Sequence, residues 1–101
     1  MNAYVGERTI DGLVVMLNGK PLPSYLDLAK YSAGGFEWGY EGNEPLQLAF
    51  AIVYSRLGNV VEARTLAKPM MKMIVANLEN EWEIPVDLID DIIADLKTSY
   101  A

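Results

Sequence analysis

Apolar and polar residues alternate along the start of the chain in a way that is typical of β-strands. The pattern predicts a strand over residues 4–10 and a returning strand over residues 13–17. The second run is continuously apolar, which suggests burial on both of its faces. Asp-Gly at 11–12 and Asn-Gly at 18–19 suit the positive φ angles of type I′ hairpin turns. Residues 20–22 are expected to pair briefly before prolines end the strand.

An aromatic residue at every second position predicts a third strand over residues 36–40. Phe36, Trp38 and Tyr40 would then share one face, with Glu37 on the other. We expect these rings to pack as core beneath the following helix, because aromatic stripes in strands are usually buried. Glu37 is expected to face solvent or to pair with Arg8. The alternative is a ligand site of Glu37, Trp38 and Tyr40, in which the rings stack on a flat molecule.

Helical periodicity replaces the strand pattern after residue 42. The first helix is predicted over residues 43–57, with Asn43 as N-cap and a glycine after its last residue. It is apolar almost all round, so we expect it at the centre of the fold. A second helix should begin at Asn59 and continue to about residue 78, with a kink or a split at Pro69. The third should begin at Pro85.

The third helix is strongly amphipathic. Its apolar face comprises Leu88, Ile89, Ile92, Ile93, Leu96 and Tyr100. Its other face carries four aspartates, at Asp87, Asp90, Asp91 and Asp95. We expect that face to be solvated, since runs of charge on a helix usually are. Two alternatives remain open, namely binding of a divalent cation by these carboxylates and mimicry of a phosphate backbone towards a basic partner.

Strands that precede helices indicate an α+β fold. We therefore predict a single α+β domain over residues 1–101, with a small three-stranded antiparallel sheet packed against three helices. A chain of 101 residues with 51% hydrophobic residues can bury a core of its own.

The net charge of −6 is unevenly distributed along the chain. Residues 1–78 carry seven acidic and seven basic side chains, whereas residues 79–101 carry seven acidic side chains and only Lys97. Such a chain lacks the basic patch that direct nucleic-acid binding needs. Cysteine and histidine are absent, which excludes thiol nucleophiles, imidazole acid–base chemistry and His/Cys metal sites. We expect a cytoplasmic protein that neither enters a membrane nor carries a metal or cofactor.

Several segments resemble a family catalogued as a domain of unknown function, DUF6166, found in microbial and phage-associated proteins. The resemblance rests on Tyr-Val-Gly-Glu-Arg-Thr-Ile-Asp-Gly at 4–12, Phe-Glu-Trp-Gly-Tyr at 36–40 and the residues from Pro45 to Ile52. It covers about residues 4–64 and is expected to fade beyond them. It implies one compact unit of phage or mobile-element origin and brings no known activity.

These observations favour a non-enzymatic protein–protein interaction or accessory module over an enzyme. No pair of carboxylates occupies a recognisable catalytic position, and no glycine-rich phosphate loop is present. The partner would be another protein or a second copy of the chain. The alternatives are a small-ligand binder or enzyme that uses Glu37, Trp38 and Tyr40, and an acidic nucleic-acid mimic that acts through the C-terminal helix.

Overall fold

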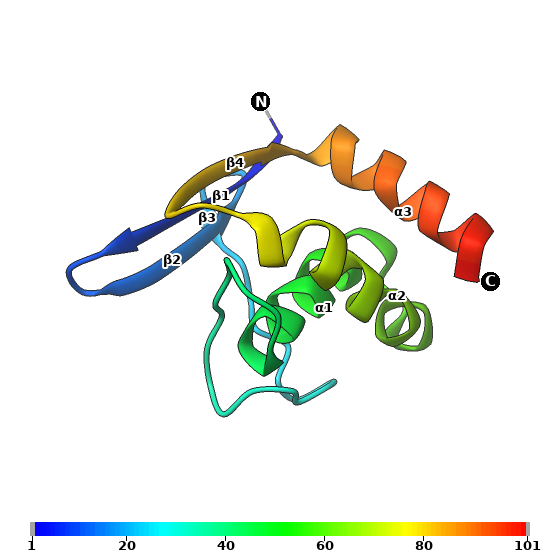
Figure 1. Ribbon diagram of the computed structural model, residues 1–101, viewed down its shortest axis with the longest axis horizontal. Coiled ribbons are helices and arrows are strands. Elements are labelled where there is room, and N and C mark those ends of the chain that lie inside the picture. The colour runs from blue at the N-terminus through cyan, green and yellow to red at the C-terminus, as the bar shows by residue number, and fades with distance from the viewer. Residues whose placement is uncertain (1, 101) are drawn as a thin grey trace.

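The chain folds as a small antiparallel sheet whose one face is packed by helices, and this computed structural model describes residues 2–100 (Figure 1). The class predicted from the sequence, α+β with an antiparallel sheet and three α-helices, is confirmed. The elements in chain order are β1 (Ala3–Thr9), β2 (Gly12–Leu17), β3 (Lys20–Pro21), α1 (Asn43–Leu57), α2 (Val60–Met73), the 3₁₀ turn η1 (Val75–Asn77), β4 (Glu81–Pro85) and α3 (Val86–Tyr100).

The sheet has four strands, in the order β3-β2-β1-β4, rather than the three that were predicted. The additional strand is β4, which lies antiparallel to β1 at one edge of the sheet. Its residues alternate between exposed glutamates and the buried side chains of Trp82 and Ile84. Strand β4 directly precedes α3 in the chain. Its pairing with β1 therefore connects the C-terminal helix to the N-terminal hairpin.

The strand predicted over residues 36–40 does not form. Side chains bind the main chain there in place of a neighbouring strand. The carbonyl of Trp38 accepts a hydrogen bond from Arg8, and its N–H donates to the carboxylate of Glu37. Gly39 then turns the chain with φ of 88°, which a side-chain-bearing residue rarely adopts. The aromatic residues therefore do not share one face of a strand.

The two hairpin turns differ in how they close. The turn at 18–19 is confirmed, with φ of 55° at Asn18 and 81° at Gly19, as a type I′ turn requires. The turn predicted at 11–12 is displaced by one residue, because Gly12 already pairs with Thr9. The hydroxyl of Thr9 accepts from the N–H of Asp11 and donates to the carbonyl of Gly12. The Thr9 side chain therefore closes the turn, and the backbone does not adopt the type I′ conformation.

One face of the sheet packs on the helices, and the opposite face is named here the outer sheet face (Figure 1). Residues directly paired across strands point to the same side, so the outer sheet face comprises Val5, Glu7, Val14, Met16, Glu81 and Glu83. Val14 is 37% exposed and Val5 38% exposed. The predicted burial of the second strand on both faces is therefore wrong, since only Val15 of β2 is buried.

Helix α1 is central, as predicted, and eight of its residues are buried. Its start differs from the prediction, because Asn43 is the first helical residue and Gly42 occupies the N-cap position without a side-chain cap. The C-cap at Gly58, in the left-handed conformation, is confirmed. The predicted N-cap of the next helix is also confirmed, since the side chain of Asn59 accepts from the N–H of Glu62.

Helix α2 contains Pro69 and ends at Met73, earlier than the predicted residue 78. The side chain of Asn77 donates to the carbonyls of Lys72 and Met73. These bonds satisfy two carbonyls that a helix end leaves without partners. The chain then passes through η1, which the prediction had placed within the helix, and enters β4, where no strand was predicted.

Gln47 holds the long irregular segment of residues 22–42 against α1. Its side chain is fully buried and makes four hydrogen bonds to that segment. The amide nitrogen donates to the carbonyls of Ser24 and Ala29, and the amide oxygen accepts from the N–H groups of Tyr31 and Ser32. One side chain thus supplies the main-chain partners that a strand or helix would otherwise provide. Within residues 2–100, no helix has both the length and the apolar character needed to cross a bilayer.

Candidate functional site

Arg8 on β1 joins the segment around Glu37 to the turn before β4. Its guanidinium forms an ion pair with Glu37 at 2.8 Å. It also donates to the side chain of Asn80 and to the carbonyl of Trp38, each at 3.0 Å. The predicted Arg8–Glu37 pair is thereby confirmed. Glu37 also accepts from the N–H of Trp38, so its carboxylate is already engaged in two structural contacts.

Trp38 is a core residue, as predicted, with 1% of its surface exposed. Its ring lies edge-to-face with that of Trp82 on β4, with ring centroids 5.5 Å apart. The guanidinium of Arg8 lies 4.9 Å from the centre of the Trp38 ring, a cation–π contact. Gly6 on β1 makes room for this arrangement, because a Cβ there would lie 2.3 Å from the ring of Trp82. Both indole N–H groups are buried without a hydrogen-bond acceptor among the described residues.

Tyr40 is separated from Trp38 by the turn at Gly39 and is 46% exposed, so its predicted place in the core is wrong. Its hydroxyl donates to the carboxylate of Glu44 on α1 at 3.3 Å. Partial desolvation, with the nearby carboxylates of Glu44 and Glu37, raises the pKa of Tyr40 above its ordinary value. The phenol therefore stays protonated near neutral pH and can donate its hydrogen bond to Glu44.

An open hollow lies beside this cluster, lined by Arg8, Glu79, Asn80 and Glu81. Two of its four lining residues are acidic, and the one basic residue is already paired with Glu37. The hollow is therefore poorly suited to an anion. The three residues proposed from the sequence gather near Arg8, but Glu37 is engaged, Trp38 is covered and Tyr40 faces Glu44. Nothing in the sequence pattern marked Asn80, whose contact depends on how β1 and β4 pair.

The aspartates of α3 fall into two groups. Asp90 accepts two hydrogen bonds from the guanidinium of Arg56 on α1, at 2.8 and 2.9 Å. These bonds hold the pKa of Asp90 below its usual range and raise the pKa of Arg56. Asp87, Asp91 and Asp95 are exposed on the side of the helix that faces away from its buried residues. They do not converge, and residues 2–100 contain no cluster of three or more acidic side chains placed to hold a metal ion.

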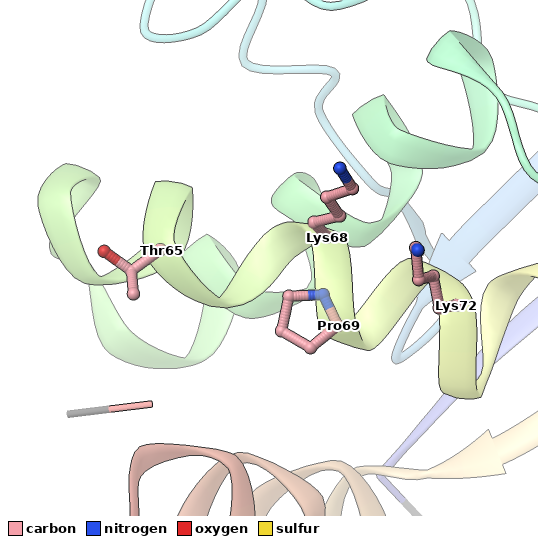
Figure 2. A pocket seen from close by; sticks show the side chains of 4 residues that line it. All are labelled: Thr65, Lys68, Pro69 and Lys72. Carbon is pink, nitrogen blue, oxygen red and sulfur yellow. The ribbon is translucent and has the colours of Figure 1, made fainter. Parts of the chain in front are cut away.

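Helix α2 carries a basic face that the sum of charges over residues 1–78 concealed. Arg64, Lys68 and Lys72 are exposed at four-residue intervals, so they share one side of the helix. Figure 2 shows Lys68 and Lys72 extending from α2 in the same direction, beside a shallow hollow that Thr65 and Pro69 also line. The helical spacing of these residues in the sequence could have identified this face.

The fold and the candidate residues define a small α+β protein with an acidic outer edge strand and a basic helix face. The chain belongs to the family described as a family of unknown function, DUF6166, whose model matches residues 4–95. The match extends well beyond residue 64, so the expected loss of similarity in the C-terminal part is wrong, and the matched residues include β4 and most of α3. No curated protein and no solved structure was found to be similar to the chain.

Proposed function

We propose that the protein is a non-enzymatic protein–protein interaction module whose contact surface is the outer sheet face with the adjacent edge of β4. The observation that carries the proposal is that α1 and α2 lie on the inner side of the sheet, and no helix of the described residues covers the outer sheet face (Figure 1). Val5, Val14 and Met16 are left partly exposed at the middle of the outer sheet face. Apolar side chains rimmed by charged ones are a common composition of interaction sites.

The contacts of two carboxylates singled out in the sequence also favour a binding role. Glu37 is held by Arg8, and Asp90 is held by Arg56. Both carboxylates are engaged in ion pairs between segments of the fold, which favours a structural role for them over acid–base catalysis. Part of the proposal is that the module acts in the cytoplasm as an accessory factor of phage or mobile-element type. That part rests on the cysteine-free composition and on the family resemblance.

The experiment begins with capture of a partner by the tagged protein in its native host, followed by reconstitution from purified components. Light scattering should show a stoichiometric complex. Val14→Lys, at the middle of the outer sheet face, should weaken that complex at least about tenfold, since a charge there would be desolvated on contact. The matched control is Val61→Lys on α2, where the side chain is 74% exposed and lies away from the sheet. Failure to form a stoichiometric complex, or equal binding by both variants, would contradict the proposal.

A small-ligand site is the second candidate, favoured by the open hollow beside Arg8. A ligand there would offer a cation to Glu79 or Glu81. Fluorescence of Trp38 and Trp82 during a screen of small cationic compounds tests this candidate. A saturable change that Arg8→Ala alters would favour it over the interaction module.

A further inference from the structure

We propose that the free edge of β4 binds an extended, basic segment of a partner protein, which adds to the sheet as a fifth strand. This inference rests on the proposed function and names the chemistry of the partner. Strand β4 is an edge strand, since it pairs with β1 alone among the described strands. An edge strand presents main-chain N–H and C=O groups that a further strand can bind.

The register determines which groups of β4 face outward. The N–H of Val86 donates to the carbonyl of Asn2, so that pair is hydrogen-bonded across the two strands. Hydrogen-bonded pairs alternate along an antiparallel ladder. Ile84 and Trp82 therefore direct their main-chain groups towards β1. Glu83 and Glu81 direct theirs away from the sheet, where no described strand lies.

Charge selects the partner. Glu7 lies directly across from Glu81, and Glu83 is one pair further along the same face. Like charges in directly opposed positions destabilise a sheet. Within residues 2–100, none of these three carboxylates has a lysine or arginine at salt-bridge distance. Arg8, which follows Glu7 in β1, lies on the inner side of the sheet and pairs with Glu37. Lysine or arginine side chains at alternate positions of an added strand would neutralise this acidic group.

A second copy of the chain does not fit the same edge. Two β4 strands side by side would bring Glu81 and Glu83 of each copy against those of the other. Glutamates and a proline on an edge strand also prevent unspecific pairing between copies. The edge thus rejects acidic and self-complementary strands and accepts a basic one. Pro85, which has no N–H, limits the addition to the part of β4 before it.

The test uses a short, end-blocked peptide of alternating lysine and valine, titrated into the full-length protein by fluorescence anisotropy and ¹⁵N NMR. The same peptide with glutamate in place of lysine is the charge control. We expect saturable binding of the lysine peptide only. The amide signals of Glu81 and Glu83 should shift, and their hydrogen exchange should slow, because both amides gain acceptors.

Two protein variants separate the edge from general electrostatic attraction. Glu81→Gln combined with Glu83→Gln should weaken peptide binding at least about tenfold. Asp27→Asn combined with Glu41→Gln removes two exposed carboxylates elsewhere and should change binding less than about twofold. Glu83→Pro deletes an outward N–H without breaking the ladder to β1, and it should also weaken binding. Equal losses in the two paired variants, binding without shifts in β4, or no saturable binding would overturn the inference.

The same variants distinguish this inference from the proposed function. A native complex that is weakened by Val14→Lys but unaffected by Glu83→Pro removes the edge inference and leaves the interaction module standing. A complex that neither variant affects removes both. Weakening by both variants, with Val61→Lys unaffected, supports both.

Discussion

At the scale of single residues, the contacts around Trp38 explain how an irregular segment is held against the sheet. Trp82 packs on one side of the ring and the guanidinium of Arg8 on another. Gly6 leaves the space for Trp82. A tryptophan surrounded in this way contributes by its buried area and by specific aromatic and cation–π contacts.

Trp38→Ala should lower the free energy of unfolding by about 3–5 kcal/mol, because it leaves a cavity in the core. Urea titration followed by circular dichroism measures the loss. Tyr40→Ala is the matched control, since Tyr40 is partly exposed and bonded only to Glu44, and it should cost less than about 1 kcal/mol. A similar loss in the two variants would show that Trp38 has no special place in the core.

Gln47→Leu should destabilise the fold by at least about 3 kcal/mol, although leucine has a similar size and is more apolar. The substitution leaves two carbonyls and two N–H groups of residues 22–42 without their partner. Each buried polar group left unpaired costs about 1–3 kcal/mol. Hydrogen exchange at Tyr31 and Ser32 should accelerate before the rest of the chain is affected. An unchanged exchange rate at both amides would contradict this role.

Burial of Trp38 could be predicted from the sequence, whereas the role of Gln47 could not. A large aromatic residue next to an apolar helix is buried in most arrangements of the chain. A glutamine in an apolar helix resembles a residue of the solvent-facing stripe. Its burial depends on residues 24–32 folding back over α1, which no local pattern specifies. Tyr40 was mispredicted because the turn at Gly39 separates it from Trp38.

At the scale of elements, local pattern predicts a strand at residues 36–40, but the structure has an irregular segment there and a strand at β4. Both segments alternate apolar and polar residues, so periodicity does not distinguish between them. Strand β4 forms because β1 has a free edge, and every residue of β4 pairs with a residue of β1 along that edge. Residues 36–40 meet side chains of β1 instead, and Arg8 occupies the acceptor that a strand would use. Strand partners of this kind depend on tertiary structure, so α1 to α3 and the two N-terminal hairpins could be predicted from local pattern, whereas β4 could not.

The Arg56–Asp90 pair joins α1 to α3, and its effect on stability depends on pH. Hydrogen bonds from Arg56 lower the pKa of Asp90 in the folded state. The stabilisation is therefore present above the unfolded-state pKa of about 3.9 and is lost as pH falls through the folded-state pKa. Asp90→Asn should cost about 0.5–1 kcal/mol at pH 7, because the pair is partly exposed. The difference from the wild-type protein should vanish once the pH lies below the folded-state pKa of Asp90. A difference that persists there in urea titrations would contradict an ionic origin.

At the scale of the whole molecule, charge is arranged by surface rather than by position in the chain. The acidic residues after residue 78 divide between the outer sheet edge and the outward side of α3, and α2 carries a basic face. Charge counts along the sequence revealed the acidic excess near the C-terminus. They did not reveal the acidic group of Glu7, Glu81 and Glu83, because β1 and β4 are brought together only by the fold.

The outward aspartates of α3 test the nucleic-acid mimic directly. Asp87→Asn, Asp91→Asn and Asp95→Asn combined should leave the affinity for a captured partner within about threefold, since exposed charges contribute little. Circular dichroism should stay native. Loss of a basic partner in this variant, with binding that also weakens steeply as salt is added, would favour the mimic, because surface charges are screened within about 10 Å at 0.1 M salt.

Methyl-resolved NMR of the protein with its purified partner tests the central claim most directly. The methyl groups of Val5, Val14 and Met16 report on the outer sheet face, and those of Val61 and Leu88 report on exposed sides of α2 and α3. The first three signals should shift or broaden on complex formation while the other two stay unchanged. Shifts confined to Val61 or Leu88, with the outer sheet face unaffected, would contradict it.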